Sequence, residues 1–210
     1  MTDLTRVTVA AVNDDGDSIT FYLPSHVDPS YAAGLASRIN PLQLQKNTEM
    51  ILDDFDANDF KSFLHYLRHG TVDSTYIDPS DGTGIRHPAD AWRLGDKLDS
   101  KAYKNLVMDT LLKTHETLRM DIDYPSNGFA ESDVLYAYDN SQPGSNLRKF
   151  AADAYGFLIA KHPSCFFLMP DQLQELCKNN KAIQDVLQAA IRVKNGEPAP
   201  DERRDEYMEK

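Results

Sequence analysis

Apolar residues recur along this chain with two different periods, which predict strands near its start and helices over most of the remainder. Arg6–Val12 and Ser18–Leu23 are rich in β-branched and aromatic residues. They flank the turn-forming run Asn13–Asp17, and this arrangement predicts a β-hairpin. Pro24 ends the second strand because it has no N–H to donate to a neighbouring strand. Thr48–Leu52 is predicted to form a third strand.

From Asp56 onward, the apolar positions follow the spacing of amphipathic helices. Asp56 suits an N-cap, and Phe60, Phe63 and Leu64 begin a stripe that a helix would bury on one face. Gly70 follows this stripe and predicts a helix that ends in a left-handed conformation. The same reasoning predicts helices at Ser30–Ile39, Pro88–Leu98, Ser100–Arg119, Ser132–Asn140, Ser145–Lys161, Pro170–Asn179 and Lys181–Val193.

The last residues, 195–210, are charged, contain two prolines and have almost no apolar side chains. Such a segment buries too little apolar surface to offset the entropy lost on ordering. The sequence therefore predicts a disordered tail.

The charge and the cysteine content restrict the class of protein. The formal net charge of -11 repels phosphate backbones and anionic lipids, so neither nucleic acid nor a membrane is expected as a partner. Cys165 and Cys177 are too few to hold a disulfide framework, and neither a glycosylation sequon nor a signal peptide is expected. The sequence also lacks an apolar run of membrane-spanning length. We therefore expect a soluble protein of the cytoplasm or nucleus.

Two histidines are the clearest candidates for metal chemistry. His65 and His69 have the i, i+4 spacing that places two ligands on one helix face. However, His65 is not followed by Glu, and no third ligand lies nearby in the sequence, which favours two solvated histidines. Asp53, Asp54, Asp56 and Asp59 lack the ligand spacing of an EF-hand. A small metal-dependent enzyme using His65 and His69 is thus the alternative of another class.

The remaining candidate chemistry favours a role in the core. Cys165 precedes the apolar run Phe166–Met169, which is typical of a buried thiol rather than a nucleophile. Trp92 stands on a predicted helix beside Leu94, where it is either a core residue or an interface anchor. Neither a P-loop nor a nucleophile elbow occurs in the sequence. We therefore predict no enzyme, no cofactor and no metal site.

Three segments together resemble BTB/POZ proteins of the fungal type. Ile51–Gly70 is similar to the family's strand, short acidic linker and helix of pattern FxxFLxYLYTG. Ala91–Asp109 is similar to the helix pair LYxLADKLxxxxLKNxVxD. Val134–Phe150 resembles the segment of the family's helical tail that has the pattern YxNTxxGSxLRKL. The chain departs from the family at Phe21–Tyr31, where the pattern VHKxxLxxxSxxF is reduced to its last part.

The resemblance implies an α+β fold, in which a small β-sheet carries a cluster of α-helices and a mostly α-helical extension follows. It implies a BTB/POZ-like domain over residues 1–118 and the helical extension over residues 119–194, before the tail at 195–210. The implied function is a non-catalytic protein–protein interaction module that forms homo- or hetero-oligomers.

The resemblance also implies partners and the surfaces that bind them. The first partner is a second copy of the chain or another BTB-type protein. The alternative is a cullin, with the chain as a substrate adaptor of a ubiquitin ligase. A third possibility is that the chain is a divergent member of the family that has lost both partner surfaces and binds a partner specific to its own lineage. The implied partner-binding residues are Val7, Val9, Tyr31, Leu35 and Ile39 for self-association, and Tyr76, Ile77 and Ile85 for a cullin.

Overall fold

The computed structural model of the 210-residue chain describes the backbone of residues 5–9, 19–23, 50–52, 57–73, 86–120, 129–163 and 170–210. Side chains are described for residues 58–73, 88–120, 129–163 and 174–210. The chain divides into two compact units, each of which is described by itself. Unit 1 comprises residues 1–77 and 90–107, and unit 2 comprises residues 78–89 and 108–210.

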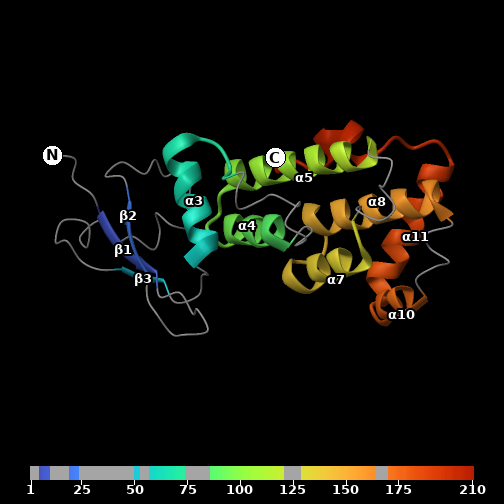
Figure 1. The fold of residues 1–210 in the computed structure, drawn as a ribbon, viewed down its shortest axis with the longest axis horizontal. Helices are drawn as coiled ribbons and strands as arrows, with labels where there is room; N and C mark the ends of the chain where they lie inside the picture. The colour runs from blue at the N-terminus through green and yellow to red at the C-terminus, as the bar shows by residue number, and fades with distance from the viewer. Residues whose placement is uncertain are drawn as a thin grey trace. The chain divides into compact units, whose positions relative to one another are not determined.

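The described strands of unit 1 are β1 (Thr5–Val9), β2 (Ile19–Leu23) and β3 (Met50–Leu52). They pair in the order β2-β1-β3, so that β1 is the central strand. β1 runs antiparallel to β2, with Val7 opposite Phe21, and parallel to β3, with Val7 opposite Met50 (Figure 1).

The α+β fold class expected from the sequence is wrong for the part of the chain whose side chains are described. Of these residues, 79% lie in helices, including a 3-10 helix, and none lies in a strand. The physical reason is that the apolar helix faces are buried against other helices. Packing of helix on helix buries these apolar faces without a sheet beneath them. The sequence pattern could not distinguish the two arrangements, because either one buries the same apolar stripes.

The described helices of unit 1 are α3 (Ala57–His69), α4 (Arg86–Lys97) and the first part of α5 (Lys101–Met120). The stripe predicted on α3 is buried: Phe60 and Phe63 are fully buried, and Leu64 is nearly so. The ring of Phe63 meets that of Tyr103 on α5 edge to face, with centroids 5.0 Å apart. Gly70 ends α3 at φ +70°, which confirms the predicted helix end.

The described helices of unit 2 include the second part of α5 together with α7 (Glu131–Asn140), α8 (Asn146–Lys161), α10 (Pro170–Lys178) and α11 (Asn180–Lys194). The structure confirms these four helices to within two residues of their predicted ends. α8 contacts both α7 and α11, and α10 contacts α7 and α11 (Figure 1).

α8 and α11 cross at close range through Gly156. A Cβ atom at this position would lie 2.6 Å from Ala189 Cβ and 2.9 Å from the backbone nitrogen of Ala190. A crossing this close requires small residues on both helices, since any larger side chain would push the backbones apart. The contact explains why α8 carries a glycine in its interior, where glycine is otherwise unfavourable.

The structure differs from the sequence prediction for residues 195–210. A 3-10 helix, η2 (Pro200–Glu206), follows an extended connection, and Tyr207 after it is fully buried. The segment is ordered because the rest of unit 2 supplies charged partners and a place for this one aromatic ring. A sequence window that contains only the segment cannot reveal those partners.

Candidate functional site

The partner residues expected from the sequence occupy different parts of the chain. Val7 and Val9 lie on β1, where each is paired with β2 on one side and with β3 on the other. These positions therefore offer no free strand edge to a second chain. Six others lie outside the described residues: Tyr31, Leu35, Ile39, Tyr76, Ile77 and Ile85.

The two histidines of α3 lie close together. Their ring centroids are 4.5 Å apart, and His65 Nε2 lies 3.3 Å from Thr71 Oγ1. Within the described residues, no group of three or more His, Cys, Asp or Glu side chains could hold a metal ion. Cys165 and the carboxylates Asp53, Asp54 and Asp56 lie outside the residues whose side chains are described.

Trp92 lies in the core. Its side chain is 3% exposed, and Lys104 Nζ lies 4.8 Å from the centre of its ring. Lys104 also donates to Asp96 Oδ1 at 2.8 Å. The tryptophan thus joins α4 to α5 and is not presented to a partner.

The segment that resembles the family's helical tail forms the turn between α7 and α8. Gly144 turns the chain at φ +81°, and Ser145 is the N-cap of α8, accepting from the backbone N–H of Arg148 at 3.3 Å. Arg148 Nη2 donates to the carbonyl oxygens of Tyr138 and Ser141 at the end of α7. The conspicuous residues of this segment therefore satisfy helix ends.

Among the described residues of unit 2, the most extensive polar site holds residues 197–210, which we call the C-terminal segment. We call the groups that hold it the seat: Asp109, His115 and Arg119 on α5, Lys149, Phe150 and Asp153 on α8, and Arg192 on α11.

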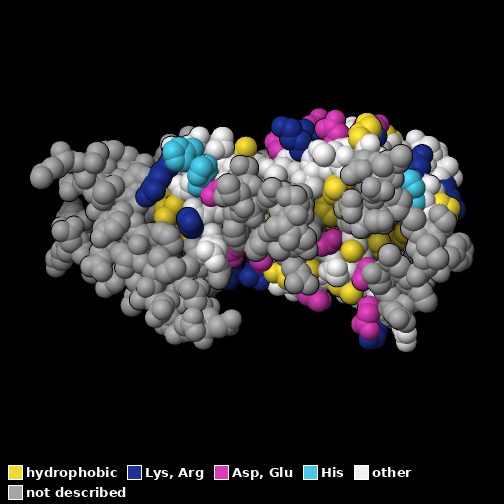
Figure 2. Space-filling model, viewed as in Figure 1, with side chains coloured by type: hydrophobic (Ala, Val, Ile, Leu, Met, Phe, Trp, Pro, Cys, Tyr) yellow, Lys and Arg dark blue, Asp and Glu magenta, His cyan; other side chains and the backbone are white. Residues whose placement is uncertain are grey.

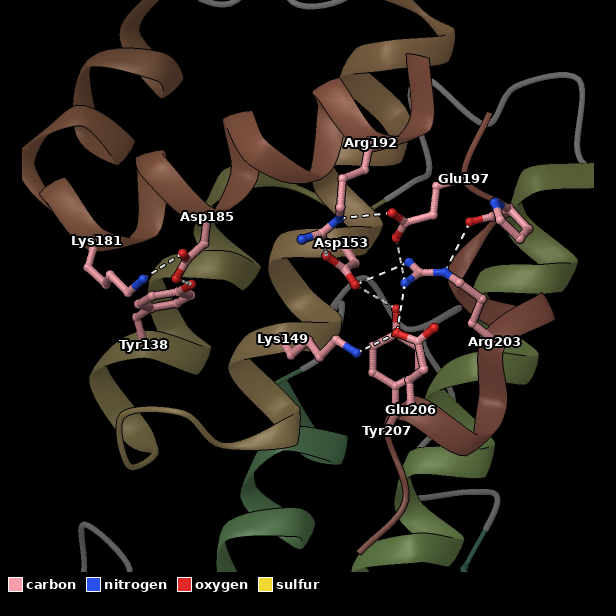
Figure 3. A network of polar contacts seen from close by, with 11 residues as sticks. Tyr138, Lys149, Asp153, Lys181, Asp185, Arg192, Glu197, Arg203, Glu206 and Tyr207 are labelled. Atoms are coloured by element: carbon pink, nitrogen blue, oxygen red, sulfur yellow. Dashed lines mark hydrogen bonds and ion pairs between the residues drawn. The ribbon is translucent and has the colours of Figure 1, made fainter. Parts of the chain in front are cut away.

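Asp153 is the centre of the seat. Its carboxylate is 3% exposed and accepts from Tyr207 Oη at 2.7 Å, from Arg203 Nη2 at 3.1 Å and from Arg192 Nη2 (Figure 3). Glu197 bridges the two guanidinium groups, 3.1 Å from Arg192 Nε and 2.6 Å from Arg203 Nη1. A buried carboxylate is tolerated here because several donors satisfy it at once.

A second anchor lies on α5. Asp201 Oδ1 is 2.7 Å from His115 Nδ1, and both Asp201 oxygens accept from Arg119 Nε at 2.9–3.0 Å. His115 is fully buried, and its ring stacks on that of Phe129 with centroids 5.9 Å apart. A neutral imidazole that carries its proton on Nδ1 can donate to Asp201 in this geometry.

Two ion pairs at the surface complete the attachment. Arg204 forms a bidentate pair with Asp109, with nitrogen–oxygen distances of 2.5 and 2.7 Å. Lys149 Nζ lies 2.6 Å from Glu206 Oε2. Acidic and basic side chains therefore lie side by side on the surface around η2, which is the red helix in Figure 1 (Figure 2). Every charge of the segment named so far meets an opposite charge on the seat or within the network.

Burial and charge shift the pKa values of this site. Burial, with the nearby Asp153 carboxylate, raises the pKa of Tyr207 far above its usual value, so the hydroxyl stays protonated and donates. Burial lowers the pKa of His115 below 6.5 and outweighs the bond to Asp201. For Asp201, burial opposes ionisation, but the hydrogen bonds from Arg119 and His115 outweigh it and lower the pKa.

The sequence interpretation did not find Asp153 or its partners, although one signal was present. Asp153 stands on α8 between Ala152 and Ala154, three residues after Phe150 and four before Phe157, and so falls on the apolar face of the helix. A carboxylate on a buried stripe requires a buried donor. In the C-terminal segment, the corresponding signal of a buried contact was Tyr207, the only aromatic residue of that segment.

The outer face of α11 shows the opposite feature, apolar side chains exposed to solvent. Ile183, Leu187 and Ile191 follow at four-residue spacing, and the last two are 45% and 59% exposed. On the opposite face, Val186, Ala189 and Val193 are buried. Of the large apolar side chains that the structure describes, only Met120 is more exposed than Ile191, at 69%.

Comparison with protein-family models, with curated proteins and with solved structures found no match to this chain. Among the described residues, no helix combines the length and the apolar character required to cross a bilayer. The function therefore has to be argued from the site itself.

Proposed function

We propose that the chain is a non-catalytic protein–protein interaction module that self-associates in the cytoplasm or nucleus. The observation that carries the proposal is the apolar stripe of Ile183, Leu187 and Ile191 on α11, in which Leu187 and Ile191 are exposed and Ile183 is half-buried. Large apolar side chains repeated on one helix face are unfavourable in contact with water, and covering them with a partner lowers the free energy. A second copy presents the same stripe, which suits a two-fold contact.

The polar groups of unit 2 support a non-catalytic role. Asp153, His115 and Asp201 are buried and engaged in ion pairs or hydrogen bonds that hold the C-terminal segment. Groups used in this way stabilise the fold and are covered from a substrate. The segments that resemble BTB/POZ proteins, a family of interaction modules, support the same function.

The test is the mass of the particle in solution, measured by light scattering over roughly 1 to 100 µM protein. We expect the unmodified chain to form dimers. The double variant Leu187→Glu, Ile191→Glu should weaken the dimer about 100-fold or more, since two partly buried apolar side chains per copy contribute a few kcal/mol. The matched control Gln184→Glu, Gln188→Glu adds the same charge on exposed positions of α11 and should leave the dimer intact.

A chain that stays monomeric over the whole range would contradict self-association. If such a monomer recovered a purified cullin in a pull-down, the adaptor function implied by the sequence resemblance would replace it. Equal weakening by the control pair would show that added charge, rather than loss of the apolar stripe, caused the effect.

A further inference from the structure

The seat recognises a specific order of side chains. Asp201 pairs with Arg119 and His115. Arg203 pairs with Asp153, and Arg204 pairs with Asp109. Glu206 pairs with Lys149. At the end, the ring of Tyr207 meets Phe150 edge to face at 5.9 Å. An occupant therefore needs an acid, two arginines, an acid and a tyrosine in this order, which is the sequence of the chain's own C-terminal segment.

The seat also requires an occupant. Without the segment, Asp153 would lose Tyr207 and Arg203 and keep only Arg192 of its three donors. The pocket of the Tyr207 ring, now fully buried, would be left empty. A buried charge without enough partners and a vacant apolar pocket are both strongly unfavourable. Only an equivalent segment restores both at once.

The connection between α11 and the segment contains residues that suit a hinge, and opening it would break the bond from the Glu197 N–H to the Arg192 carbonyl. Asn195 and Gly196 are exposed, and Gly196 turns the chain at φ +98°, a conformation that glycine adopts without strain. Ala199 is extended, at φ -61° and ψ 155°, between Pro198 and Pro200. Prolines keep such a connection extended, so opening it costs little additional entropy.

The hinge lies next to the surface proposed for self-association. The exposed stripe of α11 ends at Ile191, little more than one helical turn before Gly196. A contact between two copies along this stripe would bring the hinge of one copy beside the other.

We infer that self-association proceeds by exchange, in which the C-terminal segment of each copy leaves its own seat and occupies the seat of the other. This inference rests on the proposed self-association and specifies its mode. Both states make the same contacts in the seat, so hinge geometry and protein concentration set the equilibrium between them. The occupant of the seat in the dimer is the second copy's residues 197–210.

The ion pair between Asp109 and Arg204 allows a direct test. Its side chains are 36% and 55% exposed, so reversing either charge does not bury an unpaired ion. One full-length chain carries Asp109→Arg and a second, isotopically labelled, carries Arg204→Asp. Each variant alone places like charges together, whether its segment sits on its own seat or on that of an identical copy. In the mixture, exchange between the two variants matches both pairs.

We expect native mass spectrometry of the equimolar mixture to show the mixed dimer in roughly 3- to 10-fold preference over the two homodimers, as two restored surface pairs would give. The doubly substituted chain, Asp109→Arg with Arg204→Asp, is matched within itself and should dimerise like the unmodified chain. The pair Lys149→Glu and Glu206→Lys repeats the design on a second exposed contact.

The outcomes separate this inference from the function it rests on. If the unmodified chain is a dimer and the variants mix at random, with about half of the dimers mixed, the segments remain on their own seats and exchange is refuted. Self-association would then stand. If the unmodified chain is a monomer, self-association fails and exchange fails with it. A preferred mixed dimer in both designs supports exchange.

Discussion

Replacing Tyr207 with phenylalanine removes one hydroxyl and leaves the buried ring in place. The lost bond is the one donated to Asp153 Oδ2 at 2.7 Å. A hydrogen bond to a charged group contributes about 1.5–3 kcal/mol to stability. Asp153 Oδ2 keeps Arg203 Nη2 at 3.1 Å, so the cost of Tyr207→Phe should lie near the lower end. We expect a loss of about 1.5 kcal/mol, which lowers the folding equilibrium constant about 10-fold and the melting temperature by roughly 3–6 °C.

The assay has to follow unit 2. Trp92, the single tryptophan, belongs to unit 1, so its fluorescence is the wrong probe. Urea denaturation followed by far-ultraviolet circular dichroism, combined with hydrogen exchange of the amides of η2, reports on the helices concerned. Tyr155→Phe is the matched control, because the described part of the chain shows no hydrogen bond from that buried tyrosine. A change below about 0.3 kcal/mol, or one equal to the control, would refute the role given to the Tyr207 hydroxyl.

Two further predictions concern packing and pH. Gly156→Ala should destabilise unit 2 by about 1–3 kcal/mol in urea denaturation, because its Cβ would lie 2.6 Å from that of Ala189. A stabilised variant would show that helix propensity outweighs this clash. Because the folded-state pKa of His115 lies below 6.5, the unfolded chain takes up a proton first, and stability should fall as the pH drops below about 6.5. Asp201, whose pKa lies below 3.8, adds its loss only at lower pH, and His115→Gln should flatten the upper part of the profile; parallel profiles for the two chains would contradict this assignment.

The helices could be predicted from the sequence because their signals are local. Ser145 at the start of α8 and Gly70 at the end of α3 specify helix ends through contacts within a few residues. Apolar spacing within one turn specifies the buried face. The fold class was not predictable in the same way, since an apolar stripe does not identify the element that covers it. The helices of residues 1–118 were therefore expected to pack on a small sheet, whereas the described side chains of α3 and α5 pack helix on helix.

The seat could not be assembled from the sequence because its pairs join distant residues. Asp109 and Arg204, or Asp153 and Tyr207, meet only after α5, α8 and the C-terminal segment have come together. With 33 acidic and 22 basic residues, the chain offers far too many opposite-charge pairs for spacing alone to select the right ones. The position of Asp153 on an apolar face was a signal of a buried donor that the sequence interpretation did not use.

The C-terminal segment shows why composition alone misjudged order. The prediction of disorder counted the apolar surface of the segment and found too little to offset the lost entropy. The seat stabilises the ordered segment by burying one aromatic ring completely and by forming a set of ion pairs around Asp153. The order of the segment is therefore conditional on a seat rather than intrinsic. Because the condition is a matching seat and not a particular chain, the seat of an identical copy satisfies it as fully as the segment's own.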